Sequence, residues 1–260
     1  MEQRNNRAAK ARLSSVANSV RLLGSFSGEE DELGITTLAT RLRLAKSTVH
    51  RLATTLTSSR FLEQNSETGK YRLGLALFEL GALVRRRMDV ANEARPKLRE
   101  LLEKTGETVQ LGIVDHFSVL YVYEMESRRA IRMAAAVGAR APLHCTAVGK
   151  VLLASQPQDY VKQVLELGLT SYTPKTMTRR EPVLAMLAEV NARDYATDDE
   201  ESEIGLRAIA SPVRNHTGAV IAAVGMAAPV QRMNKKAMQT CVPDVLATAK
   251  AISARLGYLP

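Results

Sequence analysis

Two short stretches of helical periodicity, separated by only three residues, constrain the fold of the N-terminal part more than any other feature. In both stretches apolar residues recur at i, i+3, i+4 and i+7. They are Ile35, Leu38, Ala39 and Leu42, then Val49, Leu52, Ala53 and Leu56. Residues 43–45 interrupt the pattern. Two short helices joined by so tight a break predict a helix-turn-helix.

The segments on either side of these helices complete a larger unit. Downstream, "RFLEQ" and "KYRLG" flank the turn-forming "NSETG", which predicts a β-hairpin. Upstream, Ser14 or Ser15 can cap another helix. Its expected buried stripe is Val16, Val20, Leu23 and Phe26. Three helices followed by a hairpin are typical of a winged helix, in which the hairpin is the wing.

The polar side of the second helix carries cationic and hydroxyl side chains and no acid. A helix in the major groove must offer hydrogen-bonding groups to base edges and cations to phosphates. The residues expected to contact DNA are Lys46, Ser47, Thr48, His50, Arg51 and Thr54 on the helix, and Lys70 and Arg72 on the hairpin. A solvated helix face is the alternative for such a cluster. The winged-helix order around it and the net charge of +9 favour double-stranded DNA as the partner.

The remaining sequence divides the chain further. Residues 73–90 carry an apolar helical stripe that ends in three arginines, which indicates a linker helix that dimerises or packs on its own domain. From Ala91 the pattern is mixed. The expected helices are 96–104, one from Thr146, 183–193 and 234–256, and the expected strands are 108–115, 118–126, 206–213 and 219–226. The predicted fold class is α/β of the α+β kind, with a DNA-binding domain at 1–72 (including a mobile arm at 1–13), a linker at 73–90 and a second domain at 91–260.

Several features narrow the class of protein. The two cysteines are too few for a disulfide framework, and the N-terminal residues lack the apolar core of a secretory signal. No apolar run reaches the length of a membrane span. A cytoplasmic protein without membrane contact is expected.

The segment "PLHCTAVGK" combines apolar residues with a few polar ones, as small-ligand sites do. A helix starting at Thr146 would present free backbone amides to an anionic or carbonyl oxygen. Lys150 is expected to face solvent, and "AVGK" lacks the spacing of a phosphate loop. His144, Cys145 and the acidic residues 198–201 match no recognised zinc spacing, so no metal or cofactor is expected.

The motifs taken together resemble the isocitrate lyase regulator (IclR) family of bacterial transcription factors. "LAKSTVHRLATTL" and "YRLG" carry the resemblance in the N-terminal part, and "GARAPLHCTAVGKVLLA" and "DDEESEIGLRAIASPVRNHTGAVIAAVGM" carry it in the C-terminal part. The family implies a winged helix-turn-helix, a dimerising linker helix and a GAF-like effector-binding domain, often in a dimer of dimers. It also implies control of catabolic operons by small metabolites, frequently organic acids or aromatic compounds.

The resemblance also implies where an effector binds. The positions expected to contact it are His144, Cys145, Thr146, Ala147, Val148, Asp198, Leu206, Ala208, Gly225 and Ala227. Strand alternation adds Leu111 and Met133, and Phe117, Tyr121 and Tyr123 are candidates for an aromatic wall. The chain departs from the family at Arg43, where many members have glycine, and at Ala45, where proline or serine is common. Gly225 and Ala227 stand where some organic-acid-binding relatives carry hydroxyl residues.

The function expected is therefore that of a ligand-responsive regulator, a repressor of a catabolic operon, that binds a near-palindromic operator as a homodimer or dimer of dimers. The alternative is an enzyme acting on a small metabolite, with a basic N-terminal arm used for assembly. Asp198, His144 and Cys145 would then be its acid, base or nucleophile.

Overall fold

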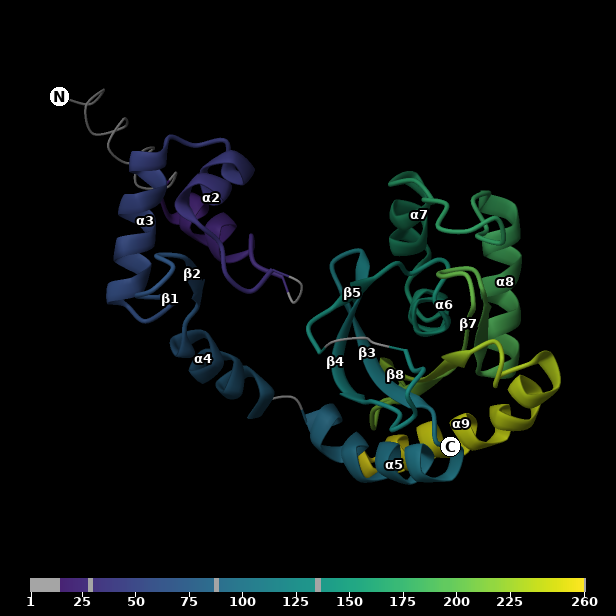
Figure 1. The fold of residues 1–260 in the computed structure, drawn as a ribbon. Coiled ribbons are helices and arrows are strands. Elements are labelled where there is room, and N and C mark those ends of the chain that lie inside the picture. The colour runs from purple at the N-terminus through teal and green to yellow at the C-terminus, as the bar shows by residue number, and fades with distance from the viewer. Residues whose placement is uncertain (1–14, 28–29, 87–88, 134–136, 260) are drawn as a thin grey trace. The chain divides into compact units, whose positions relative to one another are not determined.

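The computed structural model describes residues 15–27, 30–86, 89–133 and 137–259 (Figure 1). For residues 84–86 and 89 it describes the backbone alone. The expected mobile arm, residues 1–13, lies outside the described residues. The chain divides into two compact units, residues 1–87 and 88–260. Within the described residues, no helix is both long enough and apolar enough to cross a membrane.

The first unit is a winged helix-turn-helix, as predicted. Its elements are a helix at residues 15–23, α2 (Ile35–Leu42), α3 (Lys46–Ser58), β1 (Leu62–Gln64), β2 (Tyr71–Leu73) and α4 (Leu75–Arg86). The two strands pair antiparallel, and Leu33 forms a bridge to Tyr71. Leu22, Leu38 and Val49 are fully buried in the core that joins the helices.

The tight turn between α2 and α3 depends on a left-handed residue. Arg43 ends α2 with φ 55° and ψ 46°, and its amide donates to Thr40 O at 3.2 Å. This conformation favours glycine, which many members of the family that the sequence resembles carry there. The turn therefore keeps its geometry with an arginine in the glycine position, and the Arg43 side chain is exposed.

The predicted buried stripe of the first helix is wrong in half of its members. Val16 is 67% exposed and Val20 is 64% exposed, whereas Leu22 is fully buried. Leu23 and Phe26 pack at the edge of the core. The small unit buries only the end of this helix that lies over α2 and α3, so regular periodicity overstates its buried face.

The second unit is built on one antiparallel sheet of six strands in the order β5-β4-β3-β8-β7-β6. The strands are β3 (Thr108–Asp115), β4 (Ser118–Met125), β5 (Arg140–Ala141), β6 (Ala196–Asp199), β7 (Leu206–Arg214) and β8 (Val220–Pro229). Helices α5 (Asp89–Thr105) and α9 (Lys235–Arg255) cover one face, and α6 (Ala147–Ala154), α7 (Gln158–Glu166) and α8 (Arg180–Arg193) lie on the other (Figure 1). The antiparallel sheet with helices on both faces confirms the predicted α+β class.

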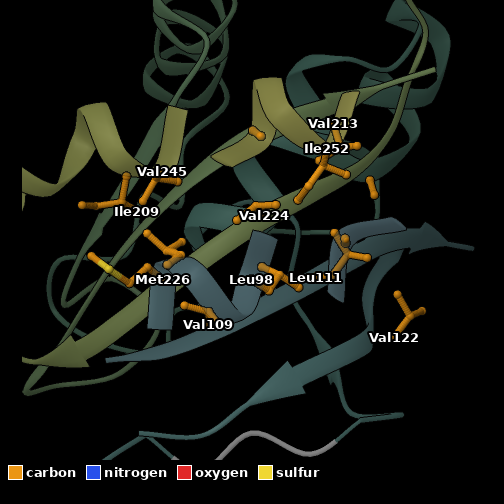
Figure 2. Close-up of a cluster of buried hydrophobic side chains, with 14 of the residues drawn as sticks. Leu98, Val109, Leu111, Val122, Ile209, Val213, Val224, Met226, Val245 and Ile252 are labelled. Atoms are coloured by element: carbon orange, nitrogen blue, oxygen red, sulfur yellow. The ribbon is translucent and has the colours of Figure 1, made fainter. Parts of the chain in front are cut away.

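A large hydrophobic core lies between the sheet and the helices α5 and α9. Figure 2 shows Leu98 of α5 and Ile252 of α9 among the inward side chains of β3, β7 and β8. Leu111 is fully buried in this core. Leu111, which was expected to contact an effector together with residues of α6, instead packs on the sheet face opposite α6.

Four elements of the second unit differ from expectation. Helix α5 begins at Asp89, not at Pro96, and it contains Pro96 in its interior. Helix α7 and strands β5 and β6 were not predicted, and β6 places Asp198 on a strand where a loop was expected. β6 is a short acidic edge strand, so neither apolar alternation nor β-propensity marks it.

Candidate nucleic-acid interface and effector site

The polar face of α3 is open, as a recognition helix requires. Lys46, Ser47, His50, Arg51 and Thr54 are exposed, and Thr48 is half-buried. The buried side of the same helix is Val49, Leu52 and Ala53. Among the described residues, none of the cations on this face forms an ion pair with a carboxylate. The structure thus brings the six predicted helix residues together on one helix.

The start of α3 leaves backbone donors available. Its N-cap is Ala45, which has no side-chain oxygen, and the first turn has no acidic residue. The amides of Thr48 and Val49 donate to Ala45 O at 3.0 and 3.1 Å. Within the described part of the chain, the amides of Lys46 and Ser47 have no acceptor. Such free amides at the positive end of a helix suit a phosphate oxygen.

The two hydroxyls further along the helix are partly engaged. Thr54 Oγ1 donates to His50 O at 2.9 Å, and Thr55 Oγ1 donates to Arg51 O at 3.0 Å. Each hydroxyl keeps lone pairs that can accept a hydrogen bond. Thr54 can therefore accept from a base amino group without losing its bond to the helix.

The wing residues differ in their surroundings. Lys70 has no acidic partner among the described residues, whereas Arg72 forms an ion pair with Glu63 at 3.0 Å and lies 3.9 Å from Glu32. A phosphate would have to compete with these carboxylates for Arg72. Arg43 was not among the predicted DNA contacts, although it is an exposed cation in the turn between α2 and α3.

In the second unit, the strand register places several predicted effector contacts on one sheet face. Asp198 pairs with Ala208, Ala208 with Ala227, and Ala227 with Thr108. Residues paired across neighbouring strands point to the same face. This row lies on the face covered by α6, and Met133 joins it, since its carbonyl accepts from Thr108 Oγ1 at 3.4 Å.

Val148 of helix α6 packs on the sheet against two glycines. A Cβ added to Gly225 would lie 2.6 Å from Val148 Cγ2, and one added to Gly112 would lie 2.6 Å from Val148 Cγ1. Both glycines therefore provide room for the valine. Gly225 has a packing role in addition to its predicted place beside an effector.

Thr146, the predicted start of helix α6, is its N-cap, and the helix begins one residue later at Ala147. Thr146 Oγ1 accepts from the amide of Gly149 at 3.0 Å and donates to Pro142 O at 2.8 Å. Ala147 and Val148 follow in the first turn and are buried. The cap fixes the helix start against the sheet, which orients this turn toward the row that contains Asp198 and Ala208.

Lys150 does not face solvent; that expectation is wrong. Its side chain is 2% exposed, and Nζ donates to Thr197 O at 2.9 Å and to Glu201 Oε1 at 2.5 Å. The long-range contact between α6 and the segment after β6 removes the ammonium from water, which local sequence cannot reveal. Glu201 Oε2 is buried and has no partner among the described residues.

Asp198 is buried and holds the turn that follows β6. Its Oδ1 accepts from the amides of Glu201 at 2.7 Å and Ser202 at 3.3 Å, and its Oδ2 accepts from Ser202 Oγ. Burial raises the pKa of Asp198 despite these hydrogen bonds. Both oxygens are thus committed to the chain's own turn, which positions Glu201 beside Lys150.

The surroundings of Cys145 make its thiol a poor nucleophile. Burial, together with the nearby Asp198 carboxylate, raises the pKa of the Cys145 thiol to about 12. Burial likewise raises the pKa of Tyr121. A thiol with such a pKa stays protonated at neutral pH, and the thiolate is the reactive form.

His144 turns to a different part of the unit. Its Nε2 lies 3.0 Å from Thr170 O, and its ring centroid lies 6.1 Å from that of Tyr172. Burial lowers the pKa of His144. Of the aromatic candidates, Tyr121 packs on the α6 side, Tyr123 packs at the edge of the opposite core, and Phe117 stacks on Tyr160.

The described residues contain no group of three or more His, Cys, Asp or Glu side chains arranged to hold a metal ion. The remaining predicted effector positions are small or apolar. Leu206 is 8% exposed, and Ala208 packs beside the α6 core. The α6 face thus combines an apolar surround with a compact set of buried ionisable groups.

Comparisons with known proteins agree with this architecture. Residues 82–254 match the family described as "Bacterial transcriptional regulator IclR C-terminal", and residues 15–66 match "IclR helix-turn-helix domain". The HTH-type transcriptional regulator KdgR of Escherichia coli K12 is 40% identical over 89% of this chain and 88% of its own length. XynR of the same strain is 36% identical over 95% of this chain and 98% of its own length.

A solved structure shows the same fold over both units. The crystal structure of an IclR homologue from Microbacterium hydrocarbonoxydans, complexed with 4-hydroxybenzoate, has a TM-score of 0.84 and 27% identity, covering 93% of this chain and 98% of that chain. With the winged helix, the sheet domain and both family matches in agreement, the chain belongs to the IclR family and is a ligand-responsive, DNA-binding transcriptional regulator.

Proposed function

We propose that the chain is a repressor of a catabolic operon that binds near-palindromic operator DNA as a homodimer or dimer of dimers. In this proposal α3 enters the major groove, with Ser47, Thr48 and His50 directed to base edges and Lys46 and Arg51 to phosphates or guanine. The open, acid-free face of α3 carries the proposal. Residues 1–72 would form the DNA-binding domain, 73–90 the linker and 91–260 the effector domain.

The linker would supply the dimer contact. Leu75, Phe78 and Leu83 of α4 are 61%, 74% and 56% exposed. Large apolar side chains exposed together indicate a surface that a partner covers. A second copy of α4 is the partner that a two-fold operator requires.

The effector would be a small organic acid or aromatic catabolite bound on the α6 face. The contacts proposed are those that the resemblance implies, from His144 to Val148 and at Asp198, Leu206, Ala208, Gly225 and Ala227. To take part, Asp198 would exchange a hydrogen bond of its own turn for one to the effector, and His144 would leave Thr170. Binding there would favour one arrangement of the dimer and so change the separation of the two α3 helices. The affinity for the two half-sites would change with it.

An enzymatic function is disfavoured by the chemistry of the candidate residues. The thiol of Cys145 stays protonated, Asp198 is engaged by its own turn, and His144 contacts Thr170. No catalytic residue, metal or cofactor is assigned. The proposed location is the cytoplasm, where a bacterial repressor binds its operator.

Footprinting on the DNA upstream of the chain's own gene and its neighbours tests the proposal. A protected, near-palindromic site that persists in competitor DNA is expected, and a candidate metabolite should release or tighten it. Protection without sequence preference, equal for the wild type and an Arg51→Ala variant, would contradict the assignment of α3 as the reading helix.

A further inference from the structure

A cavity of about 550 Å³ lies away from the α6 face of the second unit. Its lining comes from the last turns of α5, the glycine after it, the end of β4 and the segment that follows. The lining residues are Arg99, Leu102, Glu103, Gly106, Met125, Arg128 and Arg129. The volume falls in the range of small-ligand sites.

The charges at this cavity are unbalanced. Three arginines line it against the single carboxylate of Glu103. In the described part of the chain, neither Arg99 nor Arg128 forms an ion pair. Leu102 and Met125 contribute apolar surface. The cavity therefore offers guanidinium donors beside an apolar wall.

A buried carboxylate fixes the third arginine. Glu107 is 6% exposed. It accepts from Arg129 Nη1 at 2.5 Å and takes two bonds from Arg232, both at 2.7 Å. A buried carboxylate is costly unless it is paired, so this arrangement holds the Arg129 guanidinium in one place.

The loop that carries Arg128 and Arg129 is held as firmly. Ser127 is 3% exposed; its amide donates to Thr108 Oγ1 at 3.1 Å, and its Oγ donates to Gly106 O at 2.6 Å. Gly106 has φ +70°, and a Cβ there would lie 2.9 Å from Arg129 Nη2. Glycine thus allows both the turn and the close approach of the guanidinium.

We propose that this cavity is a second ligand site, distinct from the α6 face, for a small amphiphilic carboxylate. The carboxylate would accept hydrogen bonds from Arg99 and Arg128, since a planar guanidinium matches a carboxylate fork. The apolar part of the ligand would cover Leu102 and Met125. Arg129, already held by Glu107, positions the loop and adds positive potential.

Two methionines allow the sites to be distinguished. Met125 lines the cavity, and Met133 lies on the α6 face beside Gln110, with its sulfur 3.9 Å from Gln110 Nε2. The probe is octanoate, titrated into full-length protein labelled with ¹³C in the methionine methyl groups. Saturable movement of the Met125 resonance is expected, and inorganic phosphate at equal ionic strength should not reproduce it.

Paired variants test the role of the arginines. R99Q/R128Q should weaken octanoate binding at Met125 by about tenfold or more, because charge-assisted hydrogen bonds are lost. R179Q/R180Q, at the start of α8 on the opposite side of the sheet, removes the same charge and should bind as the wild type does.

Octanoate that moves Met133 without moving Met125 would overturn the proposal, as would equal binding by R99Q/R128Q and the wild type. Phosphate that moves Met125 with the affinity of octanoate would overturn the amphiphilic class. DNA binding is measured separately, so failure of this site is distinguishable from failure of the proposed function.

Discussion

Arg51 places a cation on the open side of α3, where a single side chain can decide DNA affinity. Replacing Arg51 with alanine should weaken binding to the protected operator by about 1–3 kcal/mol, because a phosphate or guanine contact is lost. A mobility-shift titration measures the effect. Thermal unfolding should change little, since the side chain is exposed.

Lys162→Ala is the matched control for loss of one charge. Lys162 lies on α7 of the second unit, in a surface pair 3.8 Å from Glu166. Operator affinity should stay close to that of the wild type. Equal weakening by both substitutions would show that net charge, and not the α3 face, sets the affinity.

Lys150 should matter for stability because it is buried and paired. Lys150→Met leaves the Glu201 carboxylate in its buried place without its cation. The free energy of unfolding should fall by about 3–5 kcal/mol, as when one partner of a buried pair is removed. Urea unfolding measures the loss, and a K150M/E201L variant, which removes both charges, should recover part of it.

The same variant should show a stronger pH dependence than the wild type, because it loses the Lys150 cation that opposes the rise in the Glu201 pKa. Burial raises the pKa of Glu201 above its ordinary value of 4.5. The folded state then binds the proton more tightly than the unfolded chain, so stability falls as the pH rises from 4.5 through the raised pKa. K150M should therefore regain stability on acidification from neutral pH. A urea midpoint for K150M that drops relative to wild type over that interval would contradict this.

At the scale of elements, the start of α3 lacks a side-chain cap. Ala45→Asp should cap the helix and stabilise the protein by about 1 kcal/mol. The same carboxylate would repel the phosphate expected near the free amides of Lys46 and Ser47, so operator affinity should fall. Thermal unfolding and mobility-shift titration measure the two effects.

Ala45→Ser separates the cap from its charge. Serine provides a similar cap without a carboxylate, so stability should rise while DNA affinity falls less than in A45D. If A45D bound the operator as tightly as the wild type, a phosphate could not lie at this helix start.

Elements with a local signal were predicted, and those that depend on distant contacts were not. Periodicity located α2, α3 and α9 closely, because each buries one regular stripe. It misjudged Val16 and Val20, since only tertiary packing decides which turn of a helix is covered. The usual place of proline in the first turn predicts a helix start at Pro96, whereas α5 contains it in its interior.

The candidate sites divide in the same way. The α3 face is contiguous in sequence, so its residues could be selected from a single helix. The Lys150–Glu201 pair joins residues 51 positions apart, and a lysine beside small residues gives no sign that it is buried. The sequence does not show which face of the sheet each strand residue occupies, so it could not reveal that Leu111 packs toward α5 and α9 and not toward α6.

At the scale of the whole molecule, the net charge of +9 and two copies of α3 should govern binding together. Operator affinity should fall steeply and log-linearly with salt, by at least about tenfold between roughly 50 and 200 mM, because bound counterions are released. The protected half-sites should be about 34 Å apart, or a multiple of that. Fluorescence anisotropy at several salt concentrations, with footprinting, measures both quantities. An operator affinity that does not change with salt, or a footprint with a single half-site, would contradict binding by a dimer through two copies of α3.

Val148 lies against Gly112 of β3 and Gly225 of β8, and a Cβ added to Gly112 would also lie 2.8 Å from Val119 Cγ1. A methyl group at Gly225 therefore needs a smaller residue at position 148, and one at Gly112 needs room at both 148 and 119. These four positions should therefore vary as a set during divergence. A relative that gained a serine at the equivalent of Gly225 would first, or simultaneously, need a smaller residue on α6. The side chains that face the ligand can then change only when an increase in side-chain size on the sheet is matched by a decrease on the helix.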